Sequence, residues 1–354
     1  MQPILEINLD HLLKNYQLCQ KTASNSEISA VVKANAYGLG APQIAQKLSQ
    51  NGCKTFFVAY LDEAIEILDY ITPDSKIYIL HGIKDFKALS QYPQIHPVIN
   101  SHEALKAIQT HAPNLKYWLH IDTGINRLGV SFKAFDDSLL NSNCVGIMSH
   151  FACADTKDHS LNKIQYERFK QLTDAFPNLQ KSLSASSGLF LNAQYHFDLI
   201  RAGICLYGGY PNPEKENLIH PVITVKVKIL QKTILKKGET TGYGATFIAK
   251  KNMRIGTLAI GYADGLFRSL FDKGEFIYKG KALKILGIIS MDLCVIDLSE
   301  LSEPDFNMIS ELEILNNSYK INHMAKDAGT IPYEILTNLG HRFKRIILEN
   351  GIRT

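Results

Sequence analysis

The first two hundred residues of this chain alternate short β-rich runs with stretches of helical periodicity. Eight such runs occur, about 24 residues apart, which leaves room for one strand, one helix and two loops in each repeat. Strands that alternate regularly with helices pair in parallel through helical crossovers. Eight repeats are the number that closes a (β/α)8 barrel. The sequence therefore predicts an α/β fold that begins with a TIM barrel, and a doubly wound open sheet is the alternative that the same alternation permits.

The repeats can be placed on the chain. The candidate strands are residues 28–32, 55–60, 76–80, 95–100, 115–122, 145–151, 182–186 and 198–203. Between them, apolar residues recur with the helical period, as in 161–176, where Leu161, Phe169 and Leu172 share one face. The segment 101–112 begins with Ser101, which can cap the first turn of a helix.

The pattern changes after Tyr210-Pro211-Asn212-Pro213, which is typical of a linker. Residues 222–229 alternate apolar and polar side chains, parts of 276–298 do the same, and glycine-containing turns separate these runs. We therefore expect two domains: a barrel over residues 10–218 and a mainly β domain over residues 219–354.

The composition is that of an ordinary globular protein: 45% of residues are hydrophobic, and 38 Lys and Arg stand against 34 Asp and Glu, spread along the chain. A dedicated nucleic-acid-binding protein would concentrate its cations on one face, so we expect no such partner. No apolar run approaches the ~20 residues of a membrane helix, and the first residues lack the features of a secretory signal. Six scattered cysteines without metal-site spacing favour reduced thiols in the cytoplasm and no bound metal.

Lys33 directly follows the first β-run, so a barrel would place it at the C-terminal mouth, which is the catalytic face. A partly desolvated amine at that mouth is suited to form a Schiff base. Gly38 and Gly40 would let the following loop pass close to a ligand. The alternative is an ordinary lysine that leaves a strand edge.

Two further strand ends carry polar groups. Asp122-Thr-Gly follows the fifth strand, but an aspartic protease needs two carboxylates in one site and the chain has a single Asp-Thr-Gly. A loop that offers Arg127 to an anion is the better interpretation. His150 ends the sixth strand; without a second ligand at helical or hairpin spacing, an orienting role is favoured over metal binding.

The last two strands of the barrel are followed by Ser184–Gly188 and Arg201–Ile204. Barrels commonly build a phosphate site from backbone N–H groups at this place, and ordinary Ser/Gly turns are the alternative. In the second domain, Tyr243 and Tyr262 stand between glycines. Either tyrosine could cap a hairpin, or act as a base if its pKa were lowered from the usual ~10.

Taken in order, eight blocks of the chain resemble alanine racemase, a fold-type III pyridoxal-phosphate enzyme family, over nearly its whole length. The blocks are Ala30–Gly38, Asp122–Gly129, Ser149–Asp155, Arg201–Gly208, Gly242–Thr246, Gly261–Gly265, Ser290–Asp292 and Ile331–Glu334. The resemblance implies that the strand 1–9 packs on the C-terminal domain. It also implies a cytoplasmic homodimer that converts L-alanine to D-alanine for peptidoglycan.

The resemblance further implies roles for single residues. Lys33 would hold pyridoxal 5'-phosphate as a Schiff base, and Arg201 would face the pyridine nitrogen. Arg127 and the backbone of Met291 would hold the substrate carboxylate. The cofactor phosphate would be cradled by Tyr37, Ser187, the backbones of Gly203 and Ile204, and Tyr333.

Racemisation needs a base on each face of the substrate Cα. The resemblance implies that Lys33 removes the α-hydrogen of the D-isomer and that Tyr243 removes the α-hydrogen of the L-isomer. It also implies that His150 activates Tyr243 and that Arg201 supports His150. It also implies active sites completed across a head-to-tail homodimer, in which the partner chain supplies Tyr243 and Met291.

Some positions depart from the family pattern. Many members carry a carbamylated lysine where this chain has His120, so Arg127 must be oriented by a bound anion or by His120 itself. Leu39 replaces a usual histidine and Ser290 a frequent cysteine. Ala185-Ser186-Ser187 replaces Ala-Asn-Ser, which keeps the phosphate hydroxyl but changes its neighbour.

Three alternatives remain open beside a racemase for alanine. A non-enzymatic pyridoxal-phosphate carrier has a similar barrel, but it lacks the β domain of residues 219–354. A fold-type III decarboxylase normally carries a glycine-rich phosphate loop that is absent from this sequence. A broader racemase for serine or lysine is compatible with the sequence, because one methylene in a pocket changes discrimination by only ~1–3 kcal/mol.

Overall fold

The computed structural model describes residues 2–137, 140–211 and 215–354, and it divides into two compact units that are described separately below. The barrel unit comprises Leu13–Leu206 and Tyr210–Ile219. The β unit comprises Met1–Leu12, Tyr207–Gly209 and His220–Thr354. Of the linker predicted from the sequence, Asn212 and Pro213 lie outside the described residues.

Eight parallel strands form the main sheet of the barrel unit, in the order β10-β2-β3-β4-β5-β6-β8-β9, which confirms the predicted fold class. At its two ends a parallel bridge joins Ala185 to Arg201, whose N–H donates to Ser184 O at 3.0 Å, so the ring nearly closes. The strands are β2 (Glu27–Val31), β3 (Thr55–Val58), β4 (Lys76–Ile79), β5 (Ile95–Ile99), β6 (Tyr117–Asp122), β8 (Cys144–Met148), β9 (Gln180–Ser182) and β10 (Leu199–Ala202).

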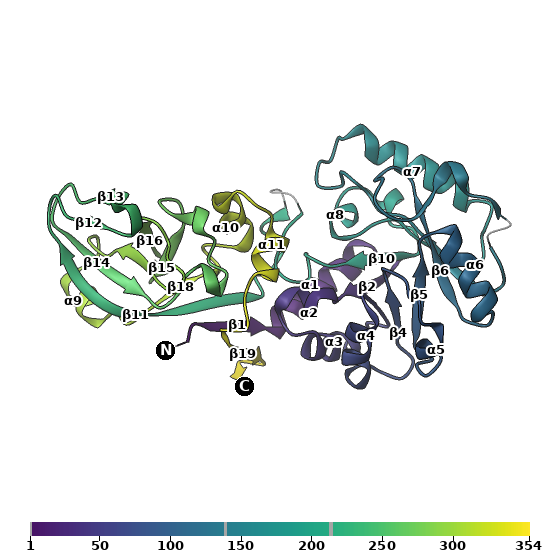
Figure 1. The fold of residues 1–354 in the computed structure, drawn as a ribbon, viewed down its shortest axis with the longest axis horizontal. Coiled ribbons are helices and arrows are strands. Elements are labelled where there is room, and N and C mark those ends of the chain that lie inside the picture. The colour runs from purple at the N-terminus through teal and green to yellow at the C-terminus, as the bar shows by residue number, and fades with distance from the viewer. Residues whose placement is uncertain (1, 138–139, 212–214) are drawn as a thin grey trace. The chain divides into compact units, whose positions relative to one another are not determined.

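Most of the helices lie outside this ring of strands (Figure 1). Ser101 caps α6, because its Oγ accepts the Ala104 N–H at 3.1 Å, and α7 occupies the helix predicted over 161–176. A short strand, β7 (Val130–Ser131), pairs with β6. The helices are α1 (Leu9–Thr22), α2 (Lys33–Gly38), α3 (Ala41–Gln50), α4 (Leu61–Ile67), α5 (Phe86–Leu89), α6 (His102–His111), α7 (Ser160–Thr173) and α8 (Ser186–Leu189).

The strands of the barrel are buried on both faces, by helices outside and by side chains inside, which explains their continuous apolar runs. In the interior, Trp118 contacts Phe57 and Tyr78, with ring centroids 6.4 and 5.6 Å apart. A Cβ at Gly146 would lie 2.6 Å from the Trp118 ring. The indole therefore requires a glycine at this place in β8.

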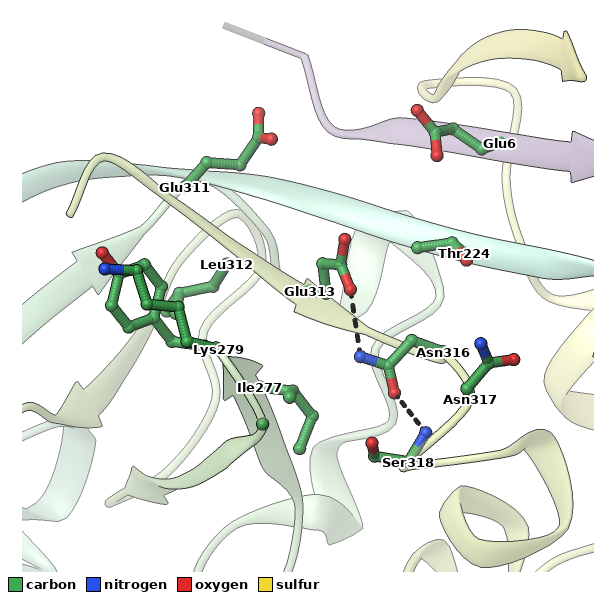
Figure 2. A pocket seen from close by; sticks show the side chains of 12 residues that line it. Glu6, Thr224, Ile277, Lys279, Glu311, Leu312, Glu313, Asn316, Asn317 and Ser318 are labelled. Atoms are coloured by element: carbon green, nitrogen blue, oxygen red, sulfur yellow. Dashed lines mark hydrogen bonds between the residues drawn. The ribbon is translucent and has the colours of Figure 1, made fainter. Parts of the chain in front are cut away.

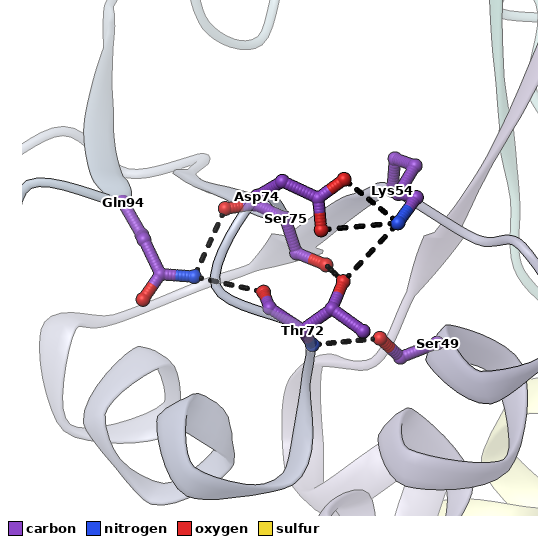
Figure 3. Close-up of polar contacts among 6 residues, drawn as sticks. All are labelled: Ser49, Lys54, Thr72, Asp74, Ser75 and Gln94. Atoms are coloured by element: carbon purple, nitrogen blue, oxygen red, sulfur yellow. Dashed lines mark hydrogen bonds and ion pairs between the residues drawn. The ribbon is translucent and has the colours of Figure 1, made fainter.

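The strands β3, β4 and β5 begin at a cluster of polar side chains that pair with one another (Figure 3). Lys54 Nζ lies 2.8 Å from Asp74 Oδ2 and donates to Thr72 Oγ1 at 3.3 Å. The Thr72 N–H donates to Ser49 Oγ, and Gln94 Nε2 donates to the carbonyls of Thr72 and Ser75. We call these six residues the N-terminal rim; they tie the loops that enter three neighbouring strands.

The β unit contains a nine-stranded sheet in the order β14-β17-β16-β15-β18-β11-β1-β19-β20. The long strand β11 also pairs with β14, after a register shift between Ile229 and Gln231, so six of the strands form a closed circuit. The strands are β1 (Ile4–Asn8), β11 (Ile223–Leu235), β14 (Met253–Leu258), β15 (Glu275–Tyr278), β16 (Lys281–Leu286), β17 (Cys294–Asp297), β18 (Glu311–Ile314), β19 (Lys344–Glu349) and β20 (Ile352–Arg353).

Smaller elements complete the β unit. A two-stranded ribbon, β12 (Thr240–Thr241) and β13 (Phe247–Ile248), flanks the Tyr243 segment. The helices of this unit are α9 (Glu303–Met308), which lies between β17 and β18, and α10 (Ile321–Ala328) and α11 (Pro332–Thr337), which follow β18. Over the described residues of both units, no helix has the length and apolar character needed to cross a bilayer.

Candidate active site

Lys33 lies two residues after the end of β2 and is half-buried at the C-terminal end of the barrel strands. The next four residues, Ala34–Tyr37, have φ between 50° and 58°, which is the left-handed helical region. This conformation costs an L-residue about 1–2 kcal/mol, because its Cβ approaches the following carbonyl oxygen. The element labelled α2 is therefore a strained left-handed turn, and it fixes the direction in which Lys33 leaves the strand.

Glu63, at the start of α4, holds this turn in place. Its Oε1 accepts the Ala34 N–H at 2.7 Å, and its Oε2 accepts the N–H groups of Ala59 and Tyr60 at 2.7 and 3.2 Å. One carboxylate thus ties the turn after Lys33 to the end of β3. No local pattern in the sequence indicates a role for Glu63, because an acidic residue in the first turn of a helix is already explained by the helix dipole.

The Lys33 amine has a lowered pKa. Burial is the largest cause, the Arg127 guanidinium lowers the pKa further, and Glu63 acts in the opposite direction. A lower pKa leaves more of the amine in its neutral, nucleophilic form. The amine is therefore suited to attack a carbonyl carbon.

Arg201, in β10, is a buried cation whose partners are all neutral. It donates to the carbonyls of Ser182 and Leu183 at 3.0 and 3.2 Å, to Ser149 O and to Ser182 Oγ. Burial lowers the pKa of Arg201 to about 9, so the guanidinium still carries its charge at neutral pH.

The same guanidinium sets the state of His150. Arg201 Nη2 lies 3.3 Å from His150 Nδ1, and a guanidinium can only donate, so Nδ1 accepts. Burial, followed by the charges of Arg201 and Arg127, lowers the pKa of His150 well below its ordinary value. The ring is therefore neutral and carries its hydrogen on Nε2.

A small cradle lies at the start of the segment after β10. A Cβ at Gly203 would come within 2.4 Å of Tyr37 Oη, so the tyrosine hydroxyl sits against a backbone that has no side chain. Ser186 Oγ accepts the Gly203 N–H at 2.9 Å and the Cys205 N–H at 3.4 Å. The Ile204 N–H and Ser187 Oγ make no hydrogen bond to any described residue. A hydroxyl and a free amide can donate hydrogen bonds to a phosphate, and a glycine without a side chain lets the phosphate approach the backbone.

The loop after β6 presents Arg127 to solvent. Asp122 Oδ1 accepts the N–H groups of Gly124 and Ile125 at 2.8 and 2.9 Å, so this carboxylate shapes the turn. Arg127 itself is exposed and has no ion pair or hydrogen bond among residues 2–137, 140–211 and 215–354. Its guanidinium is therefore available to an anion.

His120 lies beneath this loop in β6. Asn100 Nδ2 donates to Leu80 O and Val98 O, which leaves Asn100 Oδ1 to accept from His120 Nδ1 at 2.8 Å. Burial is the main cause that lowers the pKa of His120 to about 4, so the ring is neutral. Its Nε2 is therefore a buried lone pair, and no described residue donates to it.

Two side chains of α7 that the sequence analysis missed tie the ends of β6 and β8 together. Gln165 Nε2 donates to His150 O at 2.9 Å and to Thr123 Oγ1 at 3.3 Å, and Arg168 Nη1 donates to Thr123 O at 2.8 Å. They fix the backbone from which both Arg127 and His150 project. Their partners are distant in sequence, so no local pattern announces them.

The three remaining predicted residues lie in the β unit. Tyr243 is 71% exposed and begins the 3₁₀ turn η6 (Tyr243–Ala245). Met291 is 54% exposed, and Tyr333 is 38% exposed near the start of α11. The structure thus brings the predicted barrel residues into one neighbourhood, whereas Tyr243, Met291 and Tyr333 belong to the β unit.

A hollow of about 590 Å³ on the β unit is separate from all these residues (Figure 2). Glu6, Glu311 and Glu313 line it, but Glu6 pairs with Lys226 at 2.9 Å and Glu311 pairs with Lys228 at 2.9 Å.

Nowhere in the described chain do three or more His, Cys, Asp or Glu residues stand in an arrangement that could hold a metal ion.

Comparison with known proteins gives one consistent result. Residues 7–211 match the family described as "Alanine racemase, N-terminal domain", and residues 222–347 match "Alanine racemase, C-terminal domain". The chain belongs to the alanine racemase family. The predicted resemblance is confirmed.

Individual members of the family are similar over their whole length. Alanine racemase of Brucella abortus is 37% identical, and the match covers 98% of this chain and 94% of that protein. The catabolic alanine racemase of Agrobacterium fabrum is 38% identical, with coverages of 98% and 92%. The crystal structure of alanine racemase from Bartonella henselae, with covalently bound pyridoxal phosphate, superposes with a TM-score of 0.91 at 32% identity, covering 98% of this chain and 100% of that chain.

Proposed function

We propose that this chain interconverts L- and D-alanine, with pyridoxal 5'-phosphate as its cofactor. The observation that carries the proposal is the half-buried Lys33 amine, with its lowered pKa, at the barrel mouth that also holds the Tyr37–Gly203 cradle. The Bartonella relative holds the same cofactor covalently, and a lysine amine attaches an aldehyde covalently by forming a Schiff base.

The residues present fit the cofactor. Lys33 would attach it, and its phosphate would be held by Tyr37, Ser187, the backbones of Gly203 and Ile204, and Tyr333. Because Ser186 already holds the Gly203 N–H, the Ile204 N–H is the uncommitted amide of the pair. When bound, the cofactor withdraws electrons from the substrate Cα and makes its hydrogen acidic. Arg201 keeps its proton at neutral pH, so it offers the pyridine nitrogen a hydrogen bond without protonating it.

Two bases serve the two faces of the substrate. Lys33 Nζ takes the α-hydrogen of D-alanine, and Tyr243 Oη takes that of L-alanine. His150 supports Tyr243, because its Nε2 carries a hydrogen that can stabilise a phenolate while Arg201 fixes the ring through Nδ1. Tyr243→Phe should therefore slow conversion of L-alanine severely, while exchange of the D-alanine α-hydrogen with solvent survives better. Equal loss in both reactions would contradict the assignment.

We also propose a homodimer with shared active sites, in which the partner chain supplies Tyr243 and Met291. Tyr243 is 71% exposed and Met291 is 54% exposed on the same unit, and large exposed side chains of this kind fit a surface that a second chain covers. Mixing and refolding the inactive variants Lys33→Ala and Tyr243→Phe should restore about a quarter of the wild-type activity, because a mixed dimer contains one intact site. If each site lay within one chain, no activity would return.

Arg127 binds the substrate carboxylate together with the Met291 amide, and His120 orients Arg127. His120, in β6, has a buried acceptor at Nε2 to which no described residue donates, and Arg127, in the loop that follows β6, donates to no described residue. A Cβ at Gly129 would lie 3.2 Å from His120 Cδ2, so the loop that carries Arg127 folds back over the imidazole. A bound anion is the disfavoured alternative, because it would face the lone pair of Nε2.

The physiological role that we propose is supply of D-alanine for peptidoglycan, in the cytoplasm. All six cysteines are free, as expected of a reducing compartment. The Agrobacterium relative is named as catabolic, so use of alanine as a nutrient is the second candidate. Deletion of the gene should make growth depend on added D-alanine; growth without it would favour the catabolic role.

The deciding assay is incubation of the purified holoenzyme with L-alanine, L-serine and L-lysine, followed by chiral chromatography. D-alanine far ahead of the other products supports the proposal. Similar turnover of all three indicates a broader amino-acid racemase with the same two bases. A cofactor-loaded protein that forms no D-isomer would favour the carrier or decarboxylase alternatives.

A further inference from the structure

Two segments of the β unit are in unusually close contact. A Cβ at Gly261 would lie 2.3 Å from both Ser290 O and Met291 O, so only glycine allows this approach. The Tyr262 N–H donates to Ser290 O, and the Ala263 N–H donates to Met291 O, both at 3.0 Å. The turn η7 (Tyr262–Asp264) therefore holds both carbonyls of the neighbouring loop.

These contacts leave the Met291 N–H uncommitted. Within residues 2–137, 140–211 and 215–354 this N–H donates no hydrogen bond, although the carbonyl oxygens of Ser290 and Met291 each accept one. A loop whose carbonyls are fixed and whose N–H is free presents a donor in a set direction. Such a donor suits an anion.

A charged bridge ties the loop to the turn from the side. Asp264 is 1% exposed, and its Oδ2 accepts the Gly261 N–H at 2.9 Å. Arg342 Nε lies 3.2 Å from Asp264 Oδ1, and Arg342 Nη1 donates to Asp292 Oδ1 at 2.8 Å. One guanidinium therefore joins the buried carboxylate of the turn to the carboxylate that follows Met291.

We propose that Arg342 and Asp264 are positioning residues for substrate binding: they hold the Ser290–Leu293 loop so that the Met291 N–H meets the substrate carboxylate. This proposal rests on the proposed function, which assigns that amide to the substrate. Arg342 acts by geometry and by charge. An unpaired Asp292 carboxylate next to the amide would repel the incoming substrate carboxylate, and Arg342 neutralises it.

The test compares variants of the holoenzyme. Arg342→Ala should raise KM for L-alanine roughly tenfold or more while kcat changes less than about threefold, because the lost interaction is made with bound substrate as much as with the transition state. Arg342→Lys keeps the charge and should recover part of the loss. Adding Asp292→Asn to Arg342→Ala removes the repelling carboxylate and should also recover part of it.

Arg254→Ala is the matched control. It deletes a guanidinium of the same unit that pairs with Glu303 at 3.0 Å and packs on Phe306, away from the loop. It should lower the melting temperature without moving KM. If Arg342→Ala and Arg254→Ala behave alike, or if Arg342→Ala lowers kcat in proportion to stability, Arg342 is only structural and the proposal is wrong.

Hydrogen exchange separates this proposal from the proposed function. The backbone amides of Tyr262, Ala263 and Ser290, which donate to Ser290 O, Met291 O and Leu293 O, should exchange faster in Arg342→Ala than in Arg254→Ala or the wild type, whether or not the protein racemises alanine. An inactive wild type with this faster exchange would overturn the proposed function but leave the positioning of the loop. An active wild type in which exchange and KM are unaffected by Arg342→Ala would overturn the positioning role alone.

Discussion

Two lysines at opposite ends of neighbouring barrel strands have opposite surroundings. Lys54 enters β3 at the N-terminal rim, where it is exposed and paired with Asp74 and Thr72 (Figure 3). Lys33 leaves β2 at the other end, half-buried, and a second cation, Arg127, lowers its pKa. The polar groups of the N-terminal rim pair with one another. The opposite end leaves an amide at Ile204, a lone pair at His120 and a guanidinium at Arg127 without partners in the described chain.

The difference teaches where a ligand can gain binding energy. A polar group that the fold has already satisfied offers a ligand little, because an old interaction must be broken to make the new one. A preorganised polar group that lacks a partner can bind the ligand without the loss of an existing hydrogen bond. In barrels of this class, the C-terminal face carries the chemistry and the N-terminal face carries stability, and the surroundings of the two lysines are consistent with that division.

The largest expected effect comes from removing the side chain of each of the two lysines in turn. Lys33→Ala should reduce racemisation by at least about a thousandfold, because both the cofactor attachment and one base are lost. Lys54→Ala should keep kcat and cofactor content and lower the melting temperature slightly. Cofactor content is measured after borohydride reduction and denaturation. Cofactor that stays attached in Lys33→Ala would place the attachment elsewhere.

Acid should destabilise both ends of the barrel through buried histidines. Burial lowers the pKa of His96, near the start of β5, and of His120, near the end of β6, to about 4. The unfolded chain binds these protons near pH 6.5, so each neutral histidine supports the fold above that pH. The support is lost as the pH falls towards 4, by on the order of 3 kcal/mol for each group.

Urea unfolding at pH 7, 5.5 and 4 checks this expectation. His96→Phe and His120→Phe should each flatten the pH dependence, and only His120→Phe should also change KM. A pH dependence that neither variant alters would show that other groups control acid unfolding.

A smaller effect is expected from the His120–Arg127 pair. His120→Phe should raise KM for L-alanine about tenfold with little change in kcat, because Arg127 would lose the acceptor that we propose orients it. In a double-mutant cycle, Arg127→Gln should add little in the His120→Phe background. Independent, additive losses would contradict direct contact, and a KM that depends on chloride would favour a bridging anion.

The smallest effect is expected at Glu63. Glu63→Gln removes the charge that opposes the lowered pKa of Lys33, so this pKa should fall further. The rate at which the apoprotein recombines with cofactor should then reach half its maximum at a lower pH. A shift to higher pH would mean that the turn after Lys33 had rearranged. Asp62→Asn, the neighbouring acid in the first turn of α4, is the control.

The barrel could be predicted from the sequence because its strands are short apolar runs, buried on both faces, at a regular spacing. The cap at Ser101 could be predicted because its signal is local. The conformation after Lys33 could not. Ala34 and Ala36 favour right-handed helix, and only tertiary contacts such as that of Glu63 override this preference.

The candidate site was predicted mainly through resemblance, and its supporting contacts were not predicted at all. Gln165 and Arg168 act through Thr123, more than forty residues away, and Ser186 holds the Gly203 N–H by a contact across neighbouring segments. The tertiary fold of the barrel brings such partners together, and no sequence motif indicates them. The helices α10 and α11 of the β unit were likewise absent from the sequence prediction.

The turn after Lys33 has a consequence for chirality. Four consecutive L-residues adopt the backbone that is the mirror image of an ordinary helix, which is the conformation that D-residues adopt without strain. A semisynthetic chain with D-alanine at positions 34 and 36 should therefore be relieved of strain at this turn. The backbone that presents the amine therefore has the conformation that residues with the chirality of D-alanine would adopt without strain.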